Sequence, residues 1–242
     1  MQNTSIFSKK YWQDAAGNFG STHMLVFAAL IVALRVAVKM LKIPLAAGLS
    51  FSWDAYVNAI GSLVYGPLMG LAVGAVSDTL GVLLFPSNSP YFFPFILTEM
   101  ASSFIFALFF WKQKLTVPRV VLSKFTVNFV CNIVLTSVLM KWNYYVHYGL
   151  EDANAYAIIN GTRIVKNLVM FPLEAILIVL IFRALIPPLQ TARLLDRRDT
   201  PLTLTRRHYV LVAILLTLSV ALVLFYIFFL KDFVKAHNFK FF

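Results

Sequence analysis

The sequence predicts an all-α polytopic membrane protein, and three observations support that prediction. Of the 242 residues, 60% are hydrophobic and only 13% are charged, whereas soluble domains carry about 25% charged residues. The mean hydropathy is +0.79. The apolar residues also gather in runs of about 20, the length that a helix needs to cross a hydrocarbon core of ~30 Å. This composition excludes a soluble globular domain and an intrinsically disordered chain.

Seven apolar runs follow a polar N-terminal segment at residues 1–23. The turn Tyr65-Gly66-Pro67 separates the second run from the third, because proline suits the first turn of a helix but does not continue a preceding one. The seventh run contains no charged residue. The expected spans are residues 23–41, 45–64, 68–85, 91–111, 120–140, 156–182 and 209–230.

Lysine and arginine in the loops predict which side of the membrane each loop faces. The loops after the fourth and sixth spans are basic, whereas the loop after the fifth span carries only Lys141 against two acidic residues. We therefore expect a cytoplasmic N-terminus and a C-terminus on the outside. The net charge of +11 is explained by this topology and by anionic lipid rather than by nucleic acid. The arginine-rich loop at 187–208 is either a positive-inside anchor or a docking site for a cytoplasmic partner or anionic lipid.

Ionisable residues inside the expected spans are the first candidates for a functional site, because a charge in the membrane is costly. Most of them are expected in the outer half of the bundle. The seven are Arg35, Asp78, Glu99, Lys124, Arg163, Lys166 and Glu174.

Two polar stripes at helical spacing are expected to face the bundle interior, since polar groups in hydrocarbon must be satisfied. They could line a pocket, or they could join helices through Asn–Asn and Arg–Glu pairs. The sixth span contributes Arg163, Asn167, Met170 and Glu174, and the fifth contributes Asn128, Asn132 and Thr136.

Aromatic and small residues each allow two interpretations. Tyr91 and Phe92 belong to an interfacial aromatic belt, or they stack on a flat ligand. Small residues recur every four positions in the first span, at Ala29, Ala33 and Ala37, and in the third, at 66, 70 and 74. Such ladders serve packing within the chain or docking of another membrane subunit.

Motifs that would indicate an enzyme are missing from the sequence. There is no phosphate-binding loop, no H-E-x-x-H helix and no G-x-S-x-G turn. The single Cys131 forms no internal disulfide, and the four histidines do not cluster. We expect no enzymatic activity, no cofactor and no metal.

Several short motifs, in their order along the chain, resemble the substrate-binding S components of energy-coupling factor (ECF) transporters, most closely the folate-type members. The resemblance covers roughly residues 24–186. The motifs are Ala33-Leu34-Arg35-Val36, Tyr65-Gly66-Pro67, the stretch 70–81, Phe85-Pro86, the stretch 91–95 and the stretch 163–172.

This resemblance implies a six-helix protein of the bacterial plasma membrane that captures a vitamin from outside. Such a protein delivers the vitamin with a transmembrane coupling subunit and two ATPase subunits. The ladder Ala29, Ala33 and Ala37 would contact the coupling subunit, and the loop 42–54 would act as a lid. The expected organisation is a six-helix S-component-like bundle at 24–186, the basic loop 187–208, an extra transmembrane helix at 209–230 and a tail at 231–242.

A substrate-binding site for folate or a related pterin-like compound follows as a hypothesis. Arg35, Arg163 and Lys166 would supply positive charge for the carboxylates of the substrate. Asp78 or Glu99 would accept hydrogen bonds from N–H groups of the ring. Ring edges would be bound by Asn128, Asn132 and Asn167, and Tyr91 and Phe92 would stack on the ring. Two other functions remain open, a stand-alone proton-coupled carrier and a membrane scaffold without a ligand.

Overall fold

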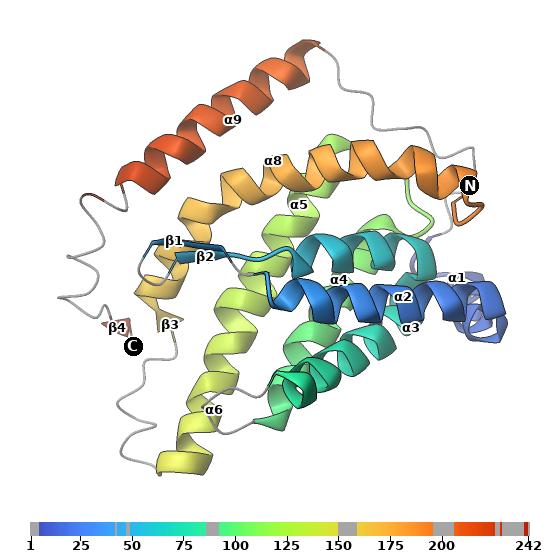
Figure 1. Ribbon diagram of the computed structural model, residues 1–242, viewed down its shortest axis with the longest axis horizontal. Helices are drawn as coiled ribbons and strands as arrows, with labels where there is room; N and C mark the ends of the chain where they lie inside the picture. The colour runs from blue at the N-terminus through green and yellow to red at the C-terminus, as the bar shows by residue number, and fades with distance from the viewer. Residues whose placement is uncertain are drawn as a thin grey trace.

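The computed structural model describes residues 5–41, 43–46, 49–85, 92–149, 159–195, 206–225, 228 and 240–241. Almost all of them are helical (Figure 1). Within these residues, five helical stretches are long and apolar enough to cross a membrane: Thr22–Lys39, Asp54–Leu84, Phe93–Phe110, Val117–Tyr148 and Arg163–Thr191. The chain is an all-α membrane protein, as the composition predicts.

The N-terminal segment begins with helix α1 (Lys9–Gly17), which the sequence pattern did not indicate. The hydroxyl of Ser8 caps it by accepting a hydrogen bond from the Tyr11 backbone N–H at 3.2 Å. Tyr11 and Ala15, one turn apart, are fully buried, and the Tyr11 ring meets Trp111 edge-on at 4.7 Å. A short polar helix gains most of its stability from such tertiary contacts, and these lie beyond a sequence pattern.

A β-hairpin follows α2 (Thr22–Lys39) and occupies the region where a second membrane helix was expected to begin. Strand β1 (Ile43–Ala46) pairs antiparallel with β2 (Leu49–Phe51), and the next helix starts only at Asp54. The predicted start at residue 45 is therefore wrong. Pro44 favours extended backbone at the residue before it, which explains why this apolar stretch is not helical.

Helix α3 (Asp54–Leu84) is broken at Gly66, so its two halves point in different directions in Figure 1. Gly66 has φ 81° and ψ −175°, and a Cβ there would lie 2.8 Å from the Trp111 ring. Only glycine suits that combination of positive φ and close contact. The predicted break at Tyr65-Gly66-Pro67 is confirmed.

The turn before α2 also contacts α3. The side chain of Asn18, in the short 3₁₀ turn η1 (Asn18–Gly20), donates a hydrogen bond to the Tyr65 carbonyl at 2.9 Å.

The glycine ladder of α3 packs within the chain, against α4 (Ile96–Phe110), which follows the turn η2 (Phe93–Phe95). A Cβ on Gly74 would lie 2.9 Å from the Glu99 carbonyl oxygen, and one on Gly70 would lie 3.5 Å from that of Ser103. For this ladder, packing within the chain is the correct interpretation.

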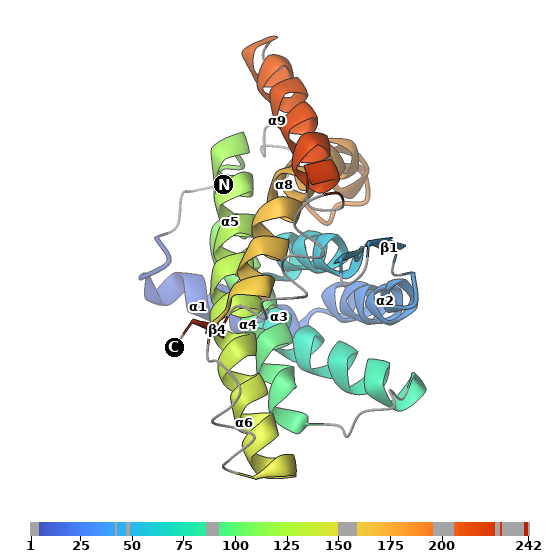
Figure 2. The same cartoon turned by 90° about the vertical axis from the view of Figure 1, so that its left-hand side faces the viewer.

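A long helical rod runs through α5 (Val117–Val127), the wider turns of η3 (Asn128–Leu135) and α6 (Thr136–Tyr148). Figure 2 shows this rod running lengthwise through the molecule, with α9 extending beyond the α5 end of it. It is longer than the predicted span 120–140. Its middle part has the π-helical pattern, which is frequent at functional sites.

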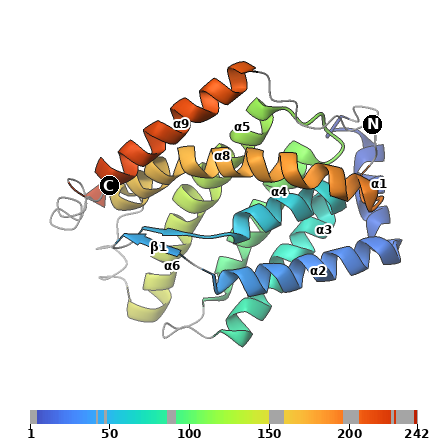
Figure 3. The same ribbon diagram turned by 45° about the horizontal axis from the view of Figure 1, so that its top comes forward.

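The last two long helices run antiparallel along each other, as Figures 1 and 3 show. After β3 (Ile159–Asn160), which pairs with β4 (Lys240–Phe241), α8 covers Gly161–Thr191 and so continues beyond the predicted end at 182. Helix α9 covers Arg206–Phe225, so it begins three residues before the expected seventh span at 209–230, and its clearly apolar part is Val212–Leu222.

The apolar core lies between α3, α4, α5 and α8. Phe106, Phe110 and Ile178 are fully buried, and the rings of Phe110 and Phe182 lie 4.8 Å apart. This core fixes the four elements around a polar cavity, which is described next.

Candidate functional site

A polar cavity of about 290 Å³ lies where the start of α3, α4, the α5–η3 rod and α8 meet. Its size is at the lower end of small-molecule sites, about 300–1,000 Å³. Charged and amide side chains make up much of its wall. The lining residues are Ser52, Asp54, Ala55, Thr98, Glu99, Ser102, Lys124, Val127, Asn132, Lys166, Asn167, Met170 and Glu174.

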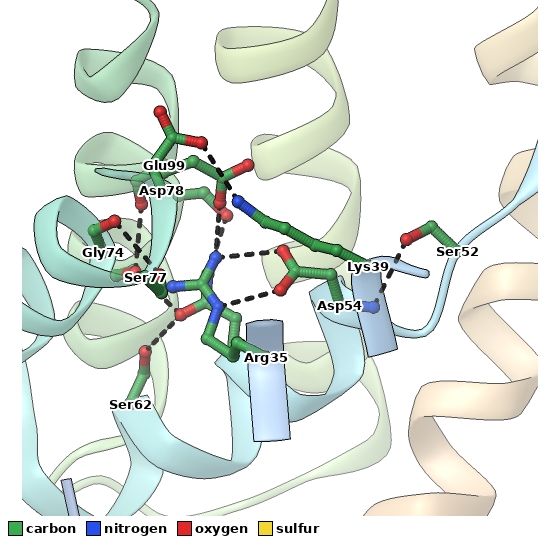
Figure 4. Close-up of polar contacts among 12 residues, drawn as sticks. Arg35, Lys39, Ser52, Asp54, Ser62, Gly74, Ser77, Asp78 and Glu99 are labelled. Atoms are coloured by element: carbon green, nitrogen blue, oxygen red, sulfur yellow. Dashed lines mark hydrogen bonds and ion pairs between the residues drawn. The ribbon is translucent and has the colours of Figure 1, made fainter. Parts of the chain in front are cut away.

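Arg35 does not line this cavity but forms ion pairs with two carboxylates that do, Asp54 and Glu99 (Figure 4). Its guanidinium is fully buried and binds Asp54 in a bidentate manner, with Nε to Oδ1 at 3.0 Å and Nη2 to Oδ2 at 2.9 Å. Nη2 also forms an ion pair with Glu99. Three elements, α2, α3 and α4, are therefore joined by one side chain.

Uncharged groups extend the network around Arg35. Its Nη1 donates to the Ser103 hydroxyl at 3.4 Å, and Ser103 donates to Asn58 Oδ1 at 2.7 Å. The amide of Asn58 donates to Ser102, which lines the cavity, at 3.0 Å. Buried polar groups that are mutually satisfied in this way give a rigid wall.

The two polar stripes predicted for the fifth and sixth spans face each other between η3 and α8, so their expected interior orientation is confirmed. Asn132 donates to Asn128 at 3.2 Å and to Asn167 at 3.3 Å. Asn128 donates to Glu174 at 2.8 Å, and Asn167 donates to the Arg163 carbonyl at 2.9 Å. The stripes thus join the helices and also line the cavity, so the two interpretations both hold.

The two cavity lysines differ in their surroundings. Lys124 is buried and lies 3.3 Å from Glu174. Lys166 lines the cavity, and no ion pair of Lys166 occurs in the described part of the chain. Lys166 is therefore the cavity cation best placed to receive a carboxylate from a ligand.

The structure brings together some of the ten predicted binding residues and separates others. Glu99, Asn132, Lys166 and Asn167 line the cavity, while Arg35 and Asn128 contact residues that line it. Arg163 lies one turn before Asn167 on α8 and does not line it.

The remaining predicted binding residues lie elsewhere or outside the described residues. Asp78 lies near Glu99 but does not line the cavity, and it pairs with Lys39 at 3.0 Å (Figure 4). Phe92 is buried, with its ring edge-on to Trp142 at 5.3 Å. Tyr91 lies outside the described residues.

Three charged lining residues were not among the predicted binding residues: Asp54, Lys124 and Glu174. Lys124 and Glu174 carried a signal, since both are ionisable residues within spans, and Glu174 belongs to the polar stripe of α8. Asp54 carried the same signal, since it lies within the expected span 45–64, but it was not predicted as a binding residue because the start of that span was uncertain.

The alanine ladder of α2 has the opposite environment from the glycine ladder of α3. Ala29, Ala33 and Ala37 are all exposed on the surface of the chain, whereas Ala28 and Ile31 on the same helix are buried. The exposed face is smooth and apolar, as a helix-docking surface requires.

Comparison with known proteins gives consistent matches. The family model described as "ECF transporter, substrate-specific component" matches residues 23–182. The chain is 31% identical over 120 residues to the folate transporter FolT of Clostridium novyi (strain NT), which covers 50% of this chain and 64% of that relative. It is 26% identical over 157 residues to the folate transporter FolT of Leuconostoc mesenteroides subsp. mesenteroides, covering 63% of this chain and 80% of the relative.

A solved structure shares the fold. A crystal structure of FolT bound with folic acid superposes with a TM-score of 0.53 and 26% sequence identity, covering 64% of this chain and 90% of that one. All residues that line the polar cavity fall within the range matched by the family model.

Proposed function

This chain belongs to the ECF transporter substrate-specific components, and we propose that it captures folate or a related pterin-like compound. The relatives named above are folate transporters, and the solved neighbour holds folic acid. The observation that carries the proposal is the cavity with two carboxylates fixed on one wall and a lysine without an ion-pair partner among the described residues.

The chemistry of folate complements that cavity. Its pterin ring is flat and presents N–H donors. Asp54 and Glu99 can accept charge-assisted hydrogen bonds from these donors. Its glutamate tail presents carboxylates, which Lys166 can bind. Asn132 and Asn167 offer both amide donors and acceptors to the ring edges.

The other predicted residues take supporting roles in this proposal. Arg35 acts as a positioning residue, because it orients Asp54 and Glu99 while being fully buried itself. Arg163 supplies further positive charge, and Asn128 orients Asn132 and Glu174. Stacking of Tyr91 and Phe92 on the ring rests on the sequence alone, because Phe92 does not line the cavity and Tyr91 lies outside the described residues. Asp78, paired with Lys39, remains a candidate acceptor only if that pair opens.

We further propose the arrangement and partners that the family implies. The segments α2, both halves of α3, α4, the α5–α6 rod and α8 form a six-segment bundle, and α9 is an additional helix. The N-terminus is cytoplasmic in a bacterial plasma membrane. The exposed ladder Ala29, Ala33 and Ala37 contacts a coupling subunit that works with two ATPase subunits, so the chain itself is a transport subunit and not an enzyme.

Titration of the purified chain with folate tests the substrate. We expect Lys166→Ala to weaken folate binding at least tenfold, because a charge-assisted contact is worth about 1.5–3 kcal/mol. The matched control is Lys114→Ala, which removes an exposed lysine outside the cavity and should leave the affinity unchanged. A chain that is folded but does not bind folate, or equal affinity in both variants, would overturn this assignment.

A further inference from the structure

A second cavity, of about 520 Å³, lies between α5, α8 and α9 and shares no lining residue with the polar cavity. Its wall is apolar throughout. Val117 and Phe125 come from α5, Phe171 and Val179 from α8, and Val212 from α9. The cavity is partly open to the surface of the chain, so a ligand can enter it from outside.

One edge of this apolar cavity is marked by an arginine. Arg183 lies one helical turn beyond Val179 on α8, and it donates a hydrogen bond to the hydroxyl of Tyr209, which lies one turn before Val212 on α9. The guanidinium carbon also lies 5.4 Å from the centre of the Tyr209 ring. The two residues therefore bridge α8 and α9 at the edge of the cavity.

The chemistry at this edge is cationic. Arg183 is exposed, and its bond to Tyr209 uses one of five N–H donors. Arg183 is the arginine that a contact places at this edge, and the sequence has further arginines at positions 193, 206 and 207. None of the residues lining the cavity is acidic.

We propose that this cavity binds an anionic phospholipid, with an acyl chain between α5, α8 and α9 and the phosphate on Arg183. An apolar space within the membrane that ends at an exposed guanidinium group fits a lipid better than a water-soluble ligand. Arginine binds phosphate through several N–H groups, which favours an anionic headgroup. The lipid then fills the seam between the family-matched part of the chain and α9.

This site is independent of folate binding, because the cavities share no lining residue. A zwitterionic lipid and a helix of a partner subunit are the other possible occupants, and the experiment below separates them. Neither one accounts for the cationic edge as an anionic headgroup does.

Photo-cross-linking in bilayers tests the proposal on the full chain. Phosphatidylglycerol carrying a diazirine in one acyl chain is compared with the matching phosphatidylcholine probe, each added at low level to phosphatidylcholine vesicles. We expect several-fold more labelling of α5, α8 and α9 by the phosphatidylglycerol probe. Equal labelling by both probes, or none at the cavity, would overturn the proposal.

Matched variants locate the two parts of the lipid. Val212→Trp fills the cavity from α9 and should reduce the labelling several-fold, whereas Leu180→Trp, on exposed α8 surface outside the cavity, should not. Arg183→Gln should abolish the preference for phosphatidylglycerol and Arg183→Lys should retain much of it. Labelling of Val212→Trp at the wild-type level contradicts the site. Circular dichroism and folate titration of each variant show that the chain remains folded.

Discussion

At the scale of single residues, the buried guanidinium of Arg35 is the most consequential group in the chain. It has no contact with solvent, and its charge is balanced by Asp54 and Glu99 alone among the described residues. A buried ion pair contributes less to stability than its geometry suggests, but loss of one partner leaves uncompensated charge and is costly. Arg35 therefore determines both the stability of the bundle and the positions of two cavity carboxylates.

Replacing Arg35 by methionine should destabilise the chain by about 3–5 kcal/mol, because Asp54 and Glu99 would be left buried without a counter-charge. Chemical unfolding in mild detergent measures this change. Lys39→Met is the matched control, since it breaks a partly exposed pair with Asp78 and should cost much less. If both variants lose a similar amount of unfolding free energy, the complete burial of Arg35 adds little to the cost of breaking its ion pairs.

The sequence predicted which polar side chains belong to the site better than which of them contact one another. Asn132 and Asn167 were found from helical spacing, because polar residues on one face of a membrane helix must meet other polar groups. Lys166 was found as a charged residue within a span. The partners of Arg35 and Asp78 could not be found in that way. They lie on other helices, and which helices meet depends on close approaches such as that of Gly74 to Glu99.

At the scale of elements, α1 is joined to the rest of the chain by two kinds of contact. Tyr11 packs against Trp111, and burial raises the pKa of its phenol to about 12. Asp14 forms an ion pair with Lys112, whose hydrogen bond holds the pKa of that carboxyl below its usual value. Neither contact depends on pH near neutrality, but the ion pair is lost in acid, where Asp14 takes up a proton.

Acidification should loosen α1 while leaving the membrane helices intact. Because the pKa of Asp14 is lowered in the folded state, its contribution is present above the ordinary carboxyl pKa of about 4 and is lost as pH falls through the folded value. Amide hydrogen exchange of residues 9–17, corrected for the intrinsic rate, should therefore quicken at low pH. Asp14→Asn should show the faster exchange already at pH 7. Exchange in the wild type that does not vary with pH would argue that Tyr11 alone holds the helix.

Sequence patterns predicted the elements unevenly. The break at Gly66 was predictable because Gly-Pro allows few backbone conformations, and α2 and α4 were predictable because their apolar runs have the right length. The hairpin at 43–51 and α1 were missed. Their residues are apolar or polar in no regular period. The hairpin is held by pairing between its own two strands, and α1 is held by packing against the distant Trp111.

At the scale of the whole molecule, the chain combines a family-matched bundle with an added helix. The family model ends at residue 182, and no residue beyond Glu174 lines the polar cavity. Helix α9 contacts α8 through Arg183 and Tyr209 and closes the apolar cavity from one side. Substrate capture and the function of α9 should therefore be separable.

A chain truncated after residue 195 should bind folate with an affinity within about threefold of the full chain, a change of about 0.65 kcal/mol, because no residue beyond Glu174 lines the polar cavity. Titration in the same detergent measures it. The truncated chain should also lose the labelling by the phosphatidylglycerol probe, because Val212 no longer closes the cavity. Loss of folate binding in a truncated chain that keeps its helicity would mean that α9 supports the substrate site.

The ion pairs of Arg35 also have a consequence for the order in which the protein is made. Asp54 follows Arg35 by 19 residues and Glu99 follows it by 64. At roughly 5–20 residues per second, α2 therefore waits about 3–13 seconds for its second counter-charge. An arginine at the centre of a lone membrane helix costs about 2.5–3.5 kcal/mol, and Arg35, four residues from the end of α2, incurs part of that cost. Nascent chains that end before α4 should therefore be the ones most readily recognised by membrane quality-control proteases.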